Sequence, residues 1–192
     1  MRLIIIDGLD GVGKDTHAQL IKNRYEKKDE KVVIRSHPEN DNFFGRKTKE
    51  SLLGKGVINR LKASIFYMMD VIRSIKKYYH RKDIDTLIIV RYLVGTAYLP
   101  GKLANIAYKF FENFVPTSNY MFFLDSPPDE LVKRVILRKE KEMFETYEKL
   151  EKVRNKSLIL VKDWNIIDTT GSIEKTHSKI DKILNYYDNK ET

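Results

Sequence analysis

The sequence of 192 residues contains no cysteine, so disulfide bonds, thiolate catalysis and cysteine-based metal sites are excluded. Its four histidines are scattered along the chain, and we expect no zinc site from them. Long apolar runs are missing too: no stretch reaches the roughly 18 residues that a membrane-spanning helix requires, and the apolar start at residues 1–7 is too short for a signal peptide. We therefore expect a cytoplasmic protein without a membrane partner.

Acidic residues are in the minority. Lysine and arginine number 36 against 27 aspartate and glutamate, which gives a formal charge of +9 and a sequence pI near 9.5. A positive surface attracts nucleotides, nucleic acid and anionic lipid, but a lysine-rich composition gives the same charge without any partner. The hydrophobic content of 42% can build one substantial core at this length, so we expect a single domain over residues 1–192.

Short apolar runs alternate with segments of helical spacing throughout the chain. The runs that predict strands are 3–6, 31–35, 86–90, 120–124 and 164–168. The segments that predict helices are 15–28, 57–81, 103–114, 129–162 and 172–187. Continuously apolar strands are typical of a parallel sheet that is covered on both faces. The pattern predicts an α/β fold with a five-stranded parallel sheet, helices on both faces, and ligands at the carboxyl ends of the strands.

The segment 129–162 is too long for one ordinary surface helix. Its middle, residues 138–142, is a run of charges without an apolar stripe. We interpret the segment as two helices joined by a basic connection, while one continuous solvated helix remains an alternative.

A glycine-rich motif follows the first predicted strand and precedes the first predicted helix. It has the pattern GxxxxGK and runs Gly8-Leu9-Asp10-Gly11-Val12-Gly13-Lys14. Glycines at these spacings allow positive φ and turn backbone amides inward, while Lys14 and the helix N-terminus add positive charge. The motif predicts a cradle for the phosphates of ATP, with these cofactor-binding residues: Gly8, Asp10, Gly11, Val12, Gly13, Lys14, Asp15 and Thr16.

One position departs from the motif. A serine or threonine that binds Mg²⁺ is expected after the lysine, but the chain has Asp15, with Thr16 one step later. A carboxylate is a good hard-oxygen ligand, so Asp15 and Thr16 are candidate metal ligands. Alternatively, Asp15 only stabilises the helix dipole from the first turn, and the sequence leaves both roles open.

Further short segments follow in a recognisable order. They are Ile6-Asp7-Gly8 with the rest of the motif as far as Thr16, His37-Pro38-Glu39, Arg91-Tyr92 with Ala97-Tyr98, Leu124-Asp125-Ser126-Pro127-Pro128, and Phe144-Glu145 with Val153-Arg154. In turn they resemble the FEGxDGxGKST opening, the phenylalanine-proline-glutamate, the DRY segment, the LDxPP and the post-lid helix of the thymidylate kinases. The resemblance spans nearly the whole chain.

The resemblance implies a P-loop kinase of nucleoside monophosphates with a lid at about residues 134–145. Such an enzyme uses ATP and Mg²⁺ to phosphorylate a nucleoside monophosphate, here most simply dTMP. It implies that Asp10 contacts the acceptor sugar, that Arg91 binds the transferred phosphoryl group, and that Asp125 reaches Mg²⁺ through water. Because the loop offers no arginine, it also implies a catalytic cation in the lid, with Arg138 as first choice. As alternatives, Asp10 braces the loop, Arg91 is a surface ion pair, and Asp125 caps a helix.

On the acceptor side the resemblance implies substrate contacts for Pro38, Tyr67, Arg73 and Tyr98. Tyr67 stands where the family has an aromatic residue, and Arg73 could replace an arginine that the family has four residues after it, where this chain has Val71. The alternative is that the aromatic stripe around Tyr67 only belongs to the core.

Other departures lie in the same region. Val90 replaces the DRY aspartate, and Asn40 replaces an arginine after proline-glutamate. We expect Asp15 to supply the carboxylate lost at Val90, since Mg²⁺ depends more on oxygen ligands than on their position in the chain. Such losses also suit a non-catalytic ATP-binding regulator, and the positive charge suits a kinase directed at nucleic acid, although we expect no nucleic-acid partner. The resemblance further implies a homodimer, for which residues 58–79 are the candidate interface.

Overall fold

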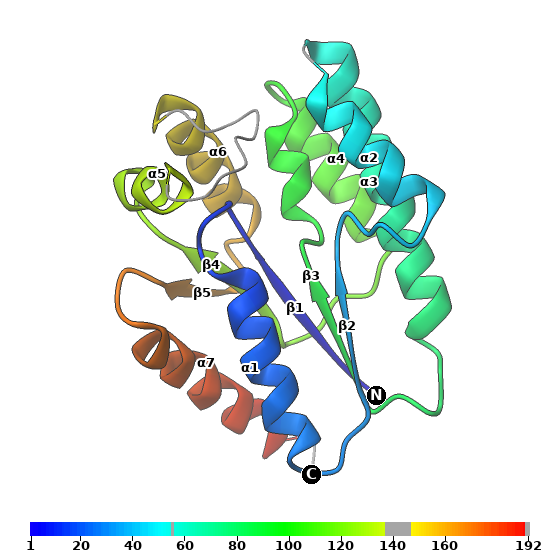
Figure 1. The fold of residues 1–192 in the computed structure, drawn as a ribbon, viewed down its shortest axis with the longest axis vertical. Helices are drawn as coiled ribbons and strands as arrows, with labels where there is room; N and C mark the ends of the chain where they lie inside the picture. The colour runs from blue at the N-terminus through cyan, green and yellow to red at the C-terminus, as the bar shows by residue number, and fades with distance from the viewer. Residues whose placement is uncertain (55, 137–146, 191–192) are drawn as a thin grey trace.

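The computed structural model describes residues 1–54, 56–136 and 147–190. Within these residues the strands form a five-stranded parallel sheet in the order β2-β3-β1-β4-β5 (Figure 1). The strands are β1 (Arg2–Gly8), β2 (Val32–Ser36), β3 (Thr86–Val90), β4 (Met121–Asp125) and β5 (Asn165–Asp168). All five predicted strands are confirmed, each within two residues of its predicted ends.

Helices cover both faces of this sheet (Figure 1). The helices of the described residues are α1 (Lys14–Glu26), α2 (Phe43–Leu53), α3 (Val57–Tyr78), α4 (Leu103–Glu112), α5 (Pro128–Ile136), α6 (Tyr147–Leu160), α7 (Ile173–Asp188) and the 3₁₀ helix η1 (Val94–Tyr98). The helical spacing of the sequence predicts α1, α3, α4 and α7 within three residues of their ends, but it does not predict α2 or η1. Asn42 caps α2 by accepting a hydrogen bond from the Gly45 amide at 3.1 Å. This asparagine is a start signal that could have identified α2.

The central strand β1 supplies both halves of the core. Ile4 and Ile6 are buried in one cluster with residues of α1 and α7, whereas Leu3 and Ile5 are buried in a second cluster with residues of α3 and α4. Successive side chains of a strand point to opposite faces, so an uninterrupted apolar strand needs a cover on each side. The two clusters confirm the sandwich that the apolar runs predicted.

The long segment after β4 forms two helices. α5 packs against α6, which one straight helix through both could not do. The two-helix interpretation is therefore confirmed, while residues 137–146, with the predicted Arg138 and most of the predicted lid, lie outside the described residues. In the part of the chain that the structure describes, no helix is long and apolar enough to cross a membrane.

The parallel arrangement brings the carboxyl ends of the strands to one edge. Gly8 lies opposite Leu124, and Val90 lies opposite both Ile6 and Ser36. The glycine motif after β1 and Arg91 after β3 therefore meet at this edge, where the sequence analysis expected ligands.

Candidate active site

The glycine motif adopts the backbone that the sequence predicts. Gly8, Gly11 and Gly13 have φ values of 145°, 91° and 91°, a region that glycine enters freely and other residues rarely do. A Cβ atom at Gly8 would also overlap the carbonyl oxygen of Leu124 on the adjacent strand. Only glycine fits at Gly8, so the loop is shaped by its backbone and not by side chains.

Lys14 is folded across this loop. Its side chain is 2% exposed, and Nζ donates to the carbonyl oxygens of Gly8 at 2.8 Å and Leu9 at 2.7 Å. Nζ also lies 3.5 Å from Oδ1 of Asp10. Burial lowers the pKa of the Lys14 ammonium, and the Asp10 carboxylate opposes that effect. A positive charge is thus enclosed by the loop that the motif predicts for phosphate.

Arg91 follows β3 and reaches the same loop. Its φ of 62° is unusual for a residue with a side chain, and such backbone is often found at functional sites. Nη2 lies 3.4 Å from Oδ1 of Asp10, and Nη1 lies 3.5 Å from Oδ2 of Asp15. Burial would lower the pKa of Arg91, but the two carboxylates outweigh it and the pKa is raised. The structure therefore brings Arg91, Asp10, Asp15 and Lys14 together.

Asp10 lies between two cations. Burial would raise the pKa of its carboxyl group, but Lys14 and Arg91 hold the pKa below its usual value. Its hydrogen bonds come from these two side chains and not from the loop amides that a bracing role would use. Asp10 is therefore an anion held between Lys14 and Arg91 at the edge of the loop.

Asp7 connects the two halves of this site, although no sequence motif assigns it a role. The side chain is buried and accepts backbone hydrogen bonds from Gly8 at 2.9 Å, Tyr92 at 2.8 Å and Val94 at 2.9 Å. Burial raises the pKa of Asp7, although the three amides oppose this. One carboxylate thus ties the start of the glycine loop to the segment that carries Arg91. An acidic residue inside an apolar strand was the signal for it.

Tyr67 on α3 packs against the segment after Arg91. A Cβ atom at Gly95 in η1 would lie 2.8 Å from Cε1 of Tyr67, so the ring leaves no room for a side chain there. The Tyr67 ring also meets the ring of His37 edge-on, with centroids 6.4 Å apart. The Tyr67 hydroxyl is buried without a hydrogen-bond partner in the described residues, and burial raises its pKa well above the usual value, with Asp7 and Tyr98 of η1 among the charges that act on it.

A buried carboxylate holds the loop around Pro38 in place. Asp70 on α3 is fully buried and accepts hydrogen bonds from Nδ1 of His37 at 3.0 Å, the Glu39 amide at 2.8 Å and Nδ2 of Asn42 at 2.7 Å. Burial would raise the pKa of Asp70, but these hydrogen bonds lower it. The network fixes the segment after β2 against α3, and sequence reasoning missed it.

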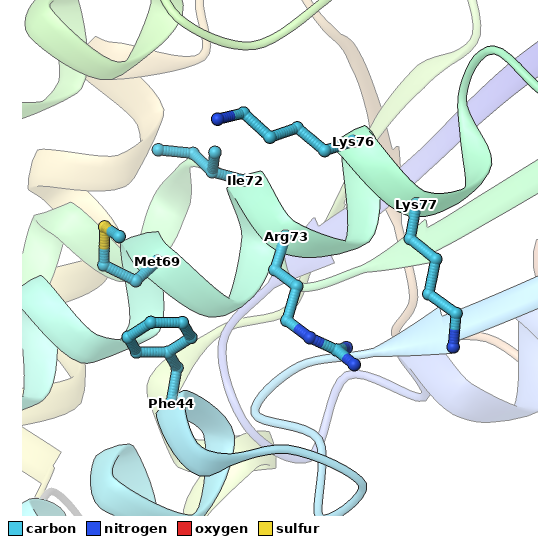
Figure 2. A pocket seen from close by; sticks show the side chains of 6 residues that line it. All are labelled: Phe44, Met69, Ile72, Arg73, Lys76 and Lys77. Atoms are coloured by element: carbon cyan, nitrogen blue, oxygen red, sulfur yellow. The ribbon is translucent and has the colours of Figure 1, made fainter.

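Arg73 is not brought to this group. It lines a separate surface hollow of about 460 Å³ with Phe44, Met69, Ile72, Lys76 and Lys77 (Figure 2). Its Nη1 lies 3.7 Å from Asp41. Arg73 is six residues after Tyr67 on the same helix, so it points to a different side of α3.

Asp125, at the end of β4, forms an ion pair across the sheet edge. Its two oxygens accept hydrogen bonds from Nε and Nη2 of Arg154 on α6, each at 2.7 Å. The Asp125 side chain is therefore paired with α6. Nearby, Arg134 donates to the carbonyl oxygen of Thr169 at 2.9 Å.

The oxygen ligands at the loop fit a metal that is bound mainly by phosphate. Asp15 has a side chain 63% exposed, and Thr16 beside it is also exposed. Among residues 1–54, 56–136 and 147–190 no group of three or more histidine, aspartate or glutamate residues could hold an ion alone. Mg²⁺ usually takes one or two protein ligands and completes its shell with phosphate and water. Asp15 and Thr16 suit that arrangement.

Comparison with known proteins agrees with this geometry. A family model described as thymidylate kinase matches residues 6–180. Probable thymidylate kinases from Methanocaldococcus jannaschii and Pyrococcus horikoshii are 28% and 27% identical over 191 and 190 residues, covering 92% of this chain and 92% of each relative. The solved structure of thymidylate kinase from Candida albicans superimposes with a TM-score of 0.77 at 19% identity, covering 98% of this chain and 92% of the other. The chain belongs to the thymidylate kinase family.

Proposed function

We propose that the protein transfers the γ-phosphoryl group of ATP to dTMP and so makes dTDP and ADP. The observation that carries the proposal is the enclosed Lys14 ammonium within 3.5 Å of Asp10, which in turn lies 3.4 Å from Arg91. The phosphate loop after β1 and the arginine after the adjacent strand β3 thus lie at one edge of the sheet. Membership of the thymidylate kinase family supports this activity over a non-catalytic regulator or a kinase directed at nucleic acid.

The reaction forms one bond and breaks one. An oxygen of the dTMP phosphate attacks the γ-phosphorus, the bond from that phosphorus to the β–γ bridging oxygen breaks, and ADP leaves. The attacking oxygen is already anionic, so no strong general base is needed, and catalysis rests on positioning and on neutralising charge.

The glycine loop holds the donor. Backbone amides of Gly11 and Gly13 and the ammonium of Lys14 contact the β- and γ-phosphates, with Gly8 and Val12 shaping the loop. For this Lys14 exchanges the carbonyl oxygens that it now contacts for phosphate oxygens. Arg91 presents a planar fork of donors that matches the phosphoryl oxygens and keeps its charge. Arg138 supplies a further cation in the proposal.

Asp15 and Thr16 would hold Mg²⁺ together with phosphate oxygens, and Asp125 would contribute through water. When bound, the ion supplies positive charge that offsets the charge of the phosphates. The carboxylate of Asp15 lies beside Arg91, at the strand end where Val90 leaves the family aspartate missing. This placement supports Asp15 as its substitute.

The acceptor lies between α3 and the segment after β3. Asp10 contacts the sugar hydroxyl, and Pro38, Tyr67 and Tyr98 line the space for the rest of the nucleotide. The packing of Tyr67 against Gly95 and His37 supports this arrangement, because it presents a firmly held aromatic ring next to Arg91.

We propose further that the protein is a homodimer. Its proposed location is the cytoplasm, where ATP and dTMP are available. α3 carries exposed apolar side chains at helical spacing: Ile58, Leu61, Ile65 and Met69 are 71%, 47%, 50% and 41% exposed. Such a stripe is typical of a surface that pairs with a second copy. Light scattering of the purified protein tests this: a dimer that Ile65→Glu dissociates supports the interface, and a monomer at all concentrations contradicts it.

A panel of monophosphates with Mg·ATP tests the activity. The proposal expects dTDP from dTMP with the highest kcat/KM of the panel. Binding of ATP without product from any acceptor would favour the regulator, and steep salt-dependent binding to oligonucleotides would favour the third alternative.

A further inference from the structure

Ser36 lies at the carboxyl end of β2 and bridges the two halves of the active site. Its Oγ donates to Oδ1 of Asp15 at 2.7 Å and accepts a hydrogen bond from Nη1 of Arg91 at 3.3 Å. Its backbone amide donates to Oε1 of Glu39 at 2.9 Å, which helps to hold the Ser36 backbone in place. Neither the sequence motifs nor the proposed mechanism gives this hydroxyl a role.

The bridge is shorter than the direct contact that it supports. Asp15 and Arg91 lie 3.5 Å apart, at the limit of a hydrogen bond, whereas the Ser36 hydroxyl is 2.7 Å from Asp15 and 3.3 Å from Arg91. A hydroxyl can donate and accept at once, so it suits a place between a carboxylate and a guanidinium. Asp15 thus reaches Arg91 more firmly through Ser36 than directly.

Arg91 needs such a partner because its long side chain has many conformations, and phosphate binding depends on the orientation of the guanidinium group. Asp10 holds Nη2, and on the other nitrogen of the fork Ser36 provides the closer contact. With both nitrogens held, the plane of the guanidinium is fixed before the substrates arrive, which lowers the cost of reaching a productive geometry.

We infer that Ser36 is a positioning residue that orients Arg91 toward the transferred phosphoryl group by linking it to Asp15 of the phosphate loop. The inference rests on the proposed phosphoryl transfer. It also extends the active site to β2, so that β1, β2 and β3 each contribute to holding one guanidinium. Ser36 acts through Arg91 and does not itself contact the reacting atoms.

The test compares Ser36→Ala with Ser36→Thr in the full-length chain. Loss of a hydrogen bond to a charged group typically corresponds to an effect of about tenfold to a hundredfold, so we expect Ser36→Ala to lower kcat by at least about tenfold. The KM for ATP and the melting temperature stay at wild-type values, because the glycine loop and the core are untouched. Ser36→Thr keeps the hydroxyl and restores most of the rate. Ser51→Ala is the matched control, since within residues 1–54, 56–136 and 147–190 that hydroxyl bonds its own helix at Lys47, and its loss leaves kcat unchanged.

A double-mutant cycle with Asp15→Ala, which removes the acceptor of the Ser36 hydroxyl, shows whether the two residues act through one contact. If they do, Ser36→Ala costs much less in the Asp15→Ala background than in the wild type. If the two substitutions lower kcat independently, so that the factor for the double variant is the product of the single factors, the bridge is contradicted.

Failure of the inference is distinguishable from failure of the proposed function. A wild-type protein that phosphorylates dTMP, with Ser36→Ala equally active, overturns the inference alone. A loss of rate matched by a fall in melting temperature and in ATP binding shows a structural role and also overturns it. A wild-type protein that phosphorylates no monophosphate refutes the proposed function, and the inference with it.

Discussion

Replacing Asp70 with alanine removes the carboxylate that holds the acceptor loop. Nδ1 of His37 and the Glu39 amide lose their acceptor, in a place where Asp70 is 0% exposed and water does not replace it. Nδ2 of Asn42 loses one of two acceptors and keeps Oδ1 of Asp41 at 2.9 Å. Each buried donor without a partner costs about 1–3 kcal/mol, and relief from burying the charge offsets part of the sum. We expect the free energy of unfolding to fall by about 3–5 kcal/mol, as when one partner of a buried pair is removed.

Urea unfolding followed by circular dichroism measures this change, with the slope of the transition compared between variants. Because the loop contains Pro38 and abuts Tyr67, the KM for dTMP should rise while the affinity for ATP stays the same. Asp83→Ala is the matched control: this carboxylate is exposed and pairs with Lys31 and Arg81, so its loss should shift the midpoint far less. A loss of less than about 1 kcal/mol for Asp70→Ala, with an unchanged KM for dTMP, would refute the reasoning.

Other substitutions test separate parts of the structure. Burial, with a smaller effect of His177, lowers the pKa of His17 to about 4. An unfolded histidine titrates near 6.5, so the unfolded chain binds more protons between these values, and stability should fall by up to about 3 kcal/mol as the pH drops from 6.5 to 4. Urea titrations of His17→Gln should lack this fall, and an identical pH profile would contradict the assignment. Gly8→Ala should abolish ATP binding in calorimetry and lower the melting temperature, since its φ is 145° and its Cβ would overlap Leu124; wild-type affinity would show that the loop adapts. Gly95→Ala places a Cβ 2.8 Å from Cε1 of Tyr67 and should raise the KM for dTMP but not for ATP in steady-state assays; equal changes in both would argue against Tyr67 as an acceptor contact.

The sheet could be predicted from the sequence because its signal is local. Each apolar run is a strand, and alternation with helices determines parallel pairing. The helix α2 was missed although its asparagine cap is a local signal, and it packs against α3. The 3₁₀ helix η1 follows β3 so closely that its sequence shows no period of its own.

The phosphate loop could be predicted for the same reason, since Gly8, Gly13 and Lys14 are close in sequence. The contacts that organise the rest of the site join distant residues: Asp7 to Tyr92, and Ser36 to Asp15 and Arg91. They exist because β2 and β1 flank β3 in the sheet. The order of the strands cannot be predicted from the sequence of any single segment. Closeness in sequence does not ensure closeness in space on a helix. Arg73 is only two residues after Val71, where the family has an arginine, yet it points to a different side of α3.

Transfer of label from [γ-³²P]ATP to dTMP tests the central claim most directly, with wild type and Lys14→Met compared in the presence of Mg²⁺. The account predicts labelled dTDP and an equal amount of ADP from the wild type. It predicts a rate at least about a hundredfold lower from Lys14→Met, which loses the charge that the loop encloses. ATP binding by the wild type with no labelled diphosphate, or undiminished transfer by Lys14→Met, would contradict it.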